Sequence, residues 1–491
     1  MKRIEMIYPP KKMTIMKRII VSVTSILTVA LLFFATERIS AQQVNSLYFL
    51  EKTPFHTKWN PAMAPSRAGI GIGVSSLSLN IRSDIALSDM FYPSTDGSGI
   101  PTSFLSGSGA TFLNGLNDVS NIGSTMSADL LNVGLKLGSK MYVTLSSSIN
   151  ADMGLGLPKD LFKLVMLGTN DVGGNLDLSA LNLNAMMYAK TGVGLSLKLT
   201  NNLSIGANAN YLFGLANMRM GFDEFSIASN GSSLNVTTKG DLQLTGPDFL
   251  YLDYADGKMT GPKLDQAKFD NFKSNPMSLL SKSAGKGMSF DVGLTFKPVN
   301  FLTLSAAVTD LGQIKWDPAY MSRAKSNATY TYTGIDLGDN SGNIGDKMTK
   351  EMKKLIIFVP DNTSEAYTSK LTTKVNIGAE AGLANNHITL GVLSQTGITE
   401  TGKYQDYMVS LNLKPGSMLQ TAFSYSLLHG EMSSFGAAVN LKLLLFNLFV
   451  AADYIPFKVT PGVSLMKDQP KVKLPVNNSY FNLQTGFNLM F

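Results

Sequence analysis

The last residues of the chain alternate between two kinds of side chain. From 479 to 491 the odd positions are mainly apolar, and the even positions are mostly polar. Because successive side chains of a β-strand point to opposite faces, this alternation predicts a strand with one apolar face and one polar face. The even positions of 288–296 and the odd positions of 203–213 and 371–383 show the same pattern. The chain is therefore predicted to be rich in two-faced strands.

Six short turns separate alternating segments. Glycine, asparagine, proline and serine supply the backbone angles that tight hairpins require. The predicted turns lie at 138–140, 200–202, 298–300, 384–386, 415–417 and the Phe446-Asn447 step. Six hairpins give twelve strands. A first strand from Ala68 to Arg82 and a last strand from Ser479 to Phe491 raise the predicted number to fourteen.

The connections at the opposite ends of these strands are mostly long. They cover residues 83–124, 155–177, 221–286, 318–370 and 456–478, whereas those near 397–403 and 430–432 are short. Short turns at one end, long loops at the other and an even strand number are typical of outer-membrane β-barrels. The predicted fold is therefore an all-β, antiparallel transmembrane barrel of about 14 strands with both termini in the periplasm. Taken alone, the terminal strand also fits a soluble sandwich.

The charged residues of the predicted strands share the polar face. A charge that faces lipid at the middle of a bilayer costs about 2–4 kcal/mol, so this distribution favours a barrel with its charges inside. The inward charges are Asp291, Lys374, Glu380, Asp406, Lys442 and Asp453.

The N-terminal residues 1–41 have the composition of a secretory signal peptide. Lys17 and Arg18 precede an apolar run over 19–34, and Ala41 ends the segment with a small residue. The alternative is a membrane anchor, but a spanning helix needs about 20 apolar residues, more than this run contains. The segment carries seven basic and two acidic residues, hence +5 of the net charge of +7. The remaining chain is nearly neutral, so nucleic acid is not expected as a partner.

Cysteine is absent, which excludes disulfides, thiolate metal sites and a lipid anchor on a cysteine. The three histidines, His56, His387 and His429, have no ligand spacing, although His429 lies near Glu431. No phosphate loop or nucleophile elbow occurs. We therefore expect no catalytic residues, no metal and no cofactor, and the chain is not predicted to be an enzyme.

Residues 42–68 precede the first strand and are predicted to form a plug segment. They contain the run Trp59-Asn60-Pro61-Ala62-Met63-Ala64-Pro65, whose prolines oppose regular structure. An Asn-Pro-Ala plug ahead of a fourteen-stranded barrel over 69–491 resembles the FadL-like transporters. More closely, the chain resembles an uncharacterised family of Bacteroidota outer-membrane proteins with that fold.

The resemblance implies that Asn60, Pro61 and Ala62 belong to a plug that fills the lumen. It also implies passive uptake of a hydrophobic or amphipathic small molecule past that plug. Barrels of the type IX secretion system share the fold, so the alternative is a protein-interaction barrel that serves secretion or surface assembly. The fold does not choose between these functions.

A short helix is predicted after Pro158, with Asp160 at its positive end and Gly168 at its close. Such an apolar loop helix would leave an exposed hydrophobic patch unless something covers it. In FadL-like transporters a groove between loop helices binds hydrophobic ligands, and the resemblance implies that Leu161, Phe162, Leu164 and Val165 line such a groove. The alternative is that the helix caps the barrel against another loop, 274–284.

Three further partners are expected from the chain's likeness to outer-membrane barrels. That likeness implies that the barrel-assembly machinery reads the terminal strand, with Phe487, Leu489 and Phe491 as the signal residues. The lysines between Lys347 and Lys354 suit contact with acidic lipopolysaccharide or a solvated surface. The outer face is expected to contact outer-membrane lipid.

Overall fold

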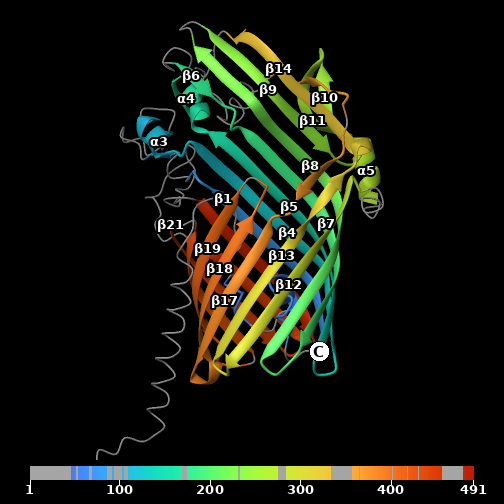
Figure 1. Ribbon diagram of the computed structural model, residues 1–491, viewed down its shortest axis with the longest axis vertical. Coiled ribbons are helices and arrows are strands. Elements are labelled where there is room, and N and C mark those ends of the chain that lie inside the picture. Colours follow the sequence, from blue (N-terminus) through green and yellow to red (C-terminus); the bar gives the residue numbers. More distant parts are fainter. Residues whose placement is uncertain are drawn as a thin grey trace, which may run out of the picture.

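Figure 1 shows the computed structural model of the chain, a barrel with a tall extension at one end. The structure describes residues 46–50, 54–65, 69–85, 91–92, 102–103, 109–167, 174–229, 233–274, 283–332, 356–363, 365–400, 402–416, 418–428, 431–455 and 479–491. The predicted signal peptide, 1–41, lies outside these residues. His429 and the lysines of 347–354 also lie outside them.

Fourteen antiparallel strands close into a barrel, as the spacing of the turns predicts (Figure 1). Each strand pairs with the next, and β1 pairs with β23, with Ile72 opposite Leu489 and Leu79 opposite Leu483. Closure gives each of these fourteen strands a partner on both sides. The strands are β1 (Ile70–Ser83), β4 (Val119–Leu137), β5 (Met141–Pro158), β7 (Asn182–Lys198), β8 (Leu203–Ser229), β12 (Gly285–Val299), β13 (Leu302–Trp316), β17 (Thr373–Leu383), β18 (Ile388–Ile398), β19 (Lys403–Leu413), β20 (Leu419–Leu428), β21 (Glu431–Leu443), β22 (Phe446–Ile455) and β23 (Ser479–Met490).

Six short turns lie at one end of the barrel, called the turn end here, and the C-terminus lies at the same end (Figure 1). Five overlap their predicted positions. The sixth is displaced by two residues, because Phe446 and Asn447 lie within β22 and the turn is Leu444-Leu445. Leu444 has a φ of 55°, an angle usually signalled by glycine or asparagine. A leucine inside an apolar run gives no such signal.

The two faces of the barrel wall differ as predicted. On β12 the side chains of Met288, Phe290 and Val292 point outward and are about half exposed. On the inner face the predicted inward carboxylates of Asp291 and Asp453 are buried. A closed barrel with an apolar outer belt and a polar interior has the surface of an outer-membrane β-barrel. Among the described helices, none has the length and apolarity needed to cross a membrane.

At the other end, called the loop end, several connections are strands rather than irregular loops. β8 is 27 residues long and continues beyond the barrel, where it pairs with β9 (Leu234–Thr245). β9 in turn pairs with β14 (Met321–Tyr332), and the three strands form a sheet above the barrel (Figure 1). A register shift between Phe222 and Glu224 keeps the apolar side chains of β8 on one face.

Smaller elements cover the apolar face of this sheet. Helix α4 (Lys159–Leu167) and β6 (Asn175–Asp177) pack over Phe225, Ile227 and Val236. The hairpin of β10 (Leu250–Ala255) and β11 (Lys258–Leu264) packs over another part. The remaining elements are the 3-10 helices η1 (Pro54–Lys58), η2 (Pro318–Tyr320) and η3 (Ala384–Asn386), the helices α3 (Gly109–Gly115) and α5 (Gln266–Ser274), and the strands β2 (Phe91–Tyr92), β3 (Thr102–Ser103), β15 (Val359–Pro360) and β16 (Tyr367–Lys370).

Candidate functional site

The described residues of the plug segment, 46–50 and 54–65, lie against the inner wall of the barrel. Leu47, Leu50 and Phe55 are almost fully buried against an apolar part of that wall. The wall residues are Ala422 on β20, Ala438 on β21, and Phe449 and Ala451 on β22. Three alanines leave the space that the larger plug side chains fill.

The Asn-Pro-Ala motif fits against β8, β12 and β13. Asn60 is fully buried, and its Nδ2 donates to the carbonyl oxygens of Leu294 at 3.2 Å and Ala306 at 3.3 Å. Its Oδ1 accepts from the backbone N–H of Ala62 at 2.9 Å. The structure therefore places all three motif residues at the plug–wall contact.

Two glycines on the wall allow this close approach. A Cβ atom at Gly293 would lie 2.1 Å from Asn60 Oδ1, and one at Gly206 would lie 2.3 Å from the carbonyl carbon of Pro61. Any larger residue at either position would push the motif from the wall.

Further polar contacts hold the plug segment. Asn208 donates to the carbonyl oxygen of Thr57 at 3.3 Å, and Asn376 donates to that of Trp59 at 3.1 Å. The plug residue Lys58 forms an ion pair with Asp129 on β4. At the start of the segment, the backbone N–H of Ser46 donates to Asp453 Oδ1 at 3.1 Å.

A cavity of about 140 Å³ lies on the loop side of the plug and is called the loop-side cavity. Its wall carries a charge network. Lys190 Nζ lies 2.6 Å from Asp310 Oδ1 and 4.0 Å from Asp291 Oδ2. Lys374 Nζ lies 3.7 Å from Asp310 Oδ2. Asp310 adopts a φ of 59°, and its N–H donates to Asp291 Oδ1 at 2.7 Å.

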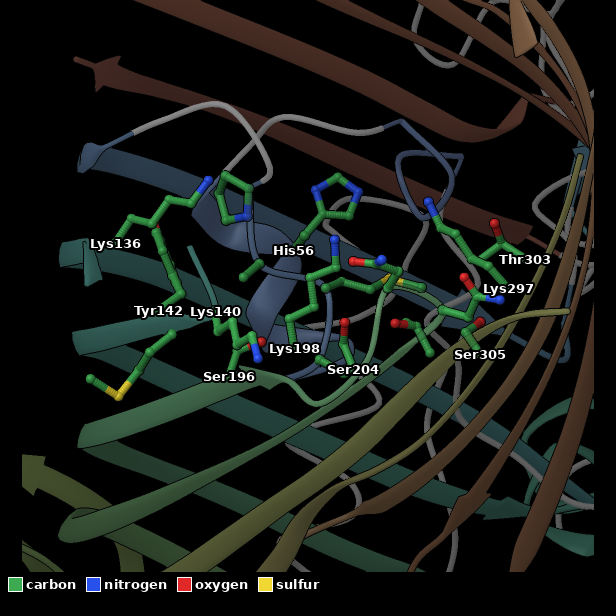
Figure 2. A pocket seen from close by; sticks show the side chains of 18 of the residues that line it. His56, Lys136, Lys140, Tyr142, Ser196, Lys198, Ser204, Lys297, Thr303 and Ser305 are labelled. Atoms are coloured by element: carbon green, nitrogen blue, oxygen red, sulfur yellow. The ribbon is translucent and has the colours of Figure 1, made fainter. Parts of the chain in front are cut away.

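A second cavity of about 320 Å³ lies on the turn side of the plug and is called the turn-side cavity (Figure 2). Plug residues that include Phe49, Met63 and Pro65 form its apolar roof. The wall supplies hydroxyl groups and four lysines. The lining lysines are Lys136 on β4, Lys140 in the β4–β5 turn, Lys198 on β7 and Lys297 on β12.

One apolar cluster separates the two cavities. Tyr48 and Phe49 are buried against Leu393 and Met408, and Trp59 and Met63 pack on the same cluster. Tyr48, Phe49 and Met63 line the turn-side cavity, whereas Trp59 lines the loop-side cavity. The barrier in the described lumen is therefore a short stretch of plug with apolar side chains.

The predicted ligand-groove residues lie on α4 at the loop end. Leu161 and Leu164 are buried in the cluster beneath β8 and β9. Phe162 is buried against Phe112 of α3, with ring centroids 5.5 Å apart. The side chain of Val165 and most of the segment 274–284 lie outside the described residues. The helix itself is confirmed, and its role in ligand binding stays a prediction.

The predicted assembly-signal residues lie on the outer side of β23. Phe487 stacks on Phe446 of the neighbouring strand with ring centroids 5.8 Å apart, and Phe491 is half exposed. Their recognition by the assembly machinery stays a prediction. No group of three metal-ligating side chains occurs within the described ranges.

Several residues around the plug were not singled out from the sequence. Asp129 and Lys190 occupy the inward face of their strands, and this parity is the signal that could have found them. Asp310 lies at a register shift of β13 with a φ of 59°, so parity does not assign its face. Gly206 and Gly293 occupy the inward face. Their partners come from distant parts of the chain, so the pairs themselves leave no local pattern.

Residues 61–453 match the model of a family of unknown function, DUF5723. No curated protein matches the chain. Solved structures with some similarity include the toluene transporter TbuX of Ralstonia pickettii, at 11% identity and a TM-score of 0.39 over 89% of this chain and 93% of that one.

Two more solved structures have comparable scores. The toluene transporter TodX of Pseudomonas putida has 9% identity and a TM-score of 0.37 over 92% of this chain and 99% of that one. A FadL homologue of Pseudomonas aeruginosa has 9% identity and a TM-score of 0.39 over 91% and 96%. These scores are low, and the barrel is established by its own strand pairing.

Proposed function

We propose that this chain, which belongs to the DUF5723 family, is a plugged outer-membrane barrel for passive uptake of a hydrophobic or amphipathic small molecule. The observation that carries the proposal is the pair of cavities on opposite sides of one short plug segment. Four of the residues between them, Tyr48, Phe49, Trp59 and Met63, belong to the N-terminal segment. Displacing that segment would join the cavities into one route.

The side chains along this route favour a molecule with both apolar and polar parts. Trp316, Ile314 and Leu212 form a buried apolar cluster on the inner wall toward the loop end. The charge network of the loop-side cavity follows, and then the apolar cluster around Phe49 and Trp59. A purely polar solute would lose hydration at the apolar clusters without gaining contacts there. An amphipathic solute can place its apolar part at these clusters and its polar part at the charge network.

We place the turn end in the periplasm and the loop end outside the cell. The short turns and the C-terminal residue lie at one end, and in outer-membrane barrels short turns are periplasmic. Uptake would then run from the loop-side cavity to the turn-side cavity. The direction is set by the ligand gradient, because no energy source is proposed.

The test is to lock the plug and measure uptake. Ser46 Oγ on the plug and Ser424 Oγ on β20 lie 2.7 Å apart, and the chain has no cysteine. A double variant, S46C with S424C, therefore carries a single possible disulfide. We expect the oxidised variant in proteoliposomes to take up N-phenylnaphthylamine at less than a tenth of the wild-type rate, and reduction to restore it.

The single variant S424C, treated with the same oxidant, is the matched control and is expected to behave as wild type. Equal uptake by the oxidised and reduced double variant would overturn a route that needs plug displacement. Uptake no faster than in liposomes without protein would overturn transport of this probe altogether.

The alternative of a type IX secretion or surface-assembly barrel has no contact among the described residues that favours it. The two functions differ in what the barrel retains on purification in mild detergent. A small amphipathic molecule in the lumen supports uptake, and a stoichiometric protein supports the alternative.

A further inference from the structure

The turn-side cavity has a charge and hydrogen-bonding character that uptake alone does not require. Its lining includes four lysines and one acidic residue, Glu380. Glu380 is already paired, because Lys414 Nζ lies 2.6 Å from its Oε1 and Thr389 Oγ1 donates to the same oxygen at 2.5 Å. By contrast, no acidic side chain in the described part of the chain pairs with Lys140, Lys198 or Lys297. The cavity therefore has a net positive charge.

Hydrogen-bond donors on the wall continue this character across neighbouring strands. Tyr142 on β5 lies opposite Lys136 on β4 and Ser196 on β7. Ser204 on β8 lies opposite Lys198 and Thr295. All of these side chains line the same cavity, and Figure 2 shows several of them beneath the plug. A band of hydroxyl groups between ammonium groups is suited to bind a negatively charged group.

Tyr142 supplies an independent observation. The residue is only 3% exposed, and its hydroxyl has no hydrogen-bond partner among the described residues. The ring lies directly over Gly134, where a Cβ atom would approach the hydroxyl oxygen to 1.9 Å. The ring is therefore held in place by the wall. A buried phenol without a protein partner costs free energy, so an acceptor bound at this hydroxyl would relieve that cost.

The roof of the cavity decides which kind of anion fits. Phe49, Met63 and Pro65 present apolar surface opposite the lysines. An inorganic anion would leave this apolar surface in contact with water. An organic anion can bury an apolar group against the plug residues while its charged group contacts the wall. The volume of about 320 Å³ lies at the lower end of the range for small-molecule sites.

We infer that the turn-side cavity is a binding site for a small organic anion, which contacts the plug and the barrel wall together. Its carboxylate or phosphate accepts one hydrogen bond from the Tyr142 hydroxyl and is neutralised by Lys198 and Lys297. Its apolar body lies against Phe49 and Met63. This binding site does not depend on the proposed uptake. Turn residues at the turn end line the cavity, so an anion can bind there whether or not a molecule passes the plug.

The experiment is isothermal titration of the full barrel, in uncharged maltoside detergent, with 3-phenylpropionate and phenyl phosphate. One control is 3-phenylpropionamide, which has the same phenylethyl group as 3-phenylpropionate but no charge. The other is inorganic phosphate, which is charged but has no apolar group. We expect both organic anions to bind at least tenfold more tightly than either control. The tighter of the two identifies carboxylate or phosphate as the preferred group.

Variants test the assigned residues. Y142F removes one hydroxyl and is expected to weaken 3-phenylpropionate about tenfold, as loss of one hydrogen bond to a charged group does. The double variant K198M with K297M is expected to weaken it further and to reduce the salt dependence. Matched controls are Y211F on the lipid face of β8 and K239M on the loop-end sheet, both expected to bind as wild type.

Equal binding of the amide and the carboxylate, or wild-type affinity in both site variants, would overturn the inference. So would equal affinity for inorganic phosphate, because the apolar roof would then have no part in binding. A hexaglutamate peptide that binds where neither organic anion does would assign the cavity to an acidic protein segment instead. Heat-modifiable electrophoretic mobility checks that each variant is folded. Because binding is measured at equilibrium, its outcome is independent of the uptake assay.

Discussion

The plug segment meets two walls of the barrel that differ in chemistry. On the side of β20, β21 and β22, Leu47, Leu50 and Phe55 fill the space left by small alanines. On the side from β8 to β17, Asn60 and the backbone of the plug are held by directed hydrogen bonds. In the closed order of fourteen strands these walls lie roughly opposite each other.

The difference between the two walls indicates how the plug is held and which of its contacts would break first when it leaves the wall. Apolar contacts depend on area and not on direction, so the first wall stabilises the plug without fixing its exact position. Hydrogen bonds weaken steeply with distance and angle, so the second wall sets the position. A displacement along the apolar wall keeps much of its contact, whereas any displacement breaks the bonds of Asn60. We therefore expect release to begin at the motif.

The largest effect is expected at the apolar wall. F55A empties a fully buried site against Phe449, and such a truncation costs about 3–5 kcal/mol. The measurement is the free energy of urea unfolding from lipid vesicles. F55L, which keeps most of the apolar volume, is the matched control and is expected to lose about 1.5 kcal/mol or less. Equal losses in the two variants would mean that packing at this wall does not hold the plug.

A smaller effect is expected at the motif. N60A removes both donated hydrogen bonds to the wall and the internal bond to Ala62. We expect a loss of about 1–3 kcal/mol in the same assay, together with a higher ion conductance in planar bilayers. N235A, at an exposed position of the loop-end sheet, is the control and is expected to stay within about 0.5 kcal/mol of wild type. A stable N60A variant with wild-type conductance would contradict release at the motif.

The smallest effect is expected at the ion pair of Lys58 with Asp129. Lys58 is 30% exposed but Asp129 only 5%, so K58M alone would leave a buried carboxylate unpaired. The double variant K58M with D129N removes both charges and is expected to cost about 1 kcal/mol or less. The difference from wild type should shrink at high salt. K239M, whose ion pair with Asp223 is mostly exposed, is expected to show no measurable loss. If the double variant costs more than N60A, the charge pair and not the motif fixes the plug.

Much of the fold could be predicted from local pattern. The alternation around Phe290 and Phe487 gives the face of each strand, and the turn residues give the strand number. The turn at Leu444-Leu445 was placed two residues too late because its residues carry no turn chemistry. The extension of β8 beyond the barrel was missed. Its apolar face changes parity at the shift near Asp223, which breaks the period of two.

The candidate site was predicted only in part. Asn60, Pro61 and Ala62 were identified by their motif, but nothing local pairs Asn60 with the carbonyl groups of β12 and β13. The four lysines of the turn-side cavity come from three separate parts of the chain, around 136–140, 198 and 297. Each alone is an ordinary charged residue in a turn or near the end of a strand. Their significance depends on closure of the barrel, which brings them around one cavity.

The sequence by itself determined the quantities that repeat along the chain: strand number, the inner and outer faces, and the end that carries short turns. These follow from a side-chain period of two and from the backbone angles of individual residues. The tertiary structure alone decided the pairings of Asn60 with the wall and of Lys190 with Asp310. Such pairings join residues far apart in the chain, and their geometry exists only once β1 closes on β23.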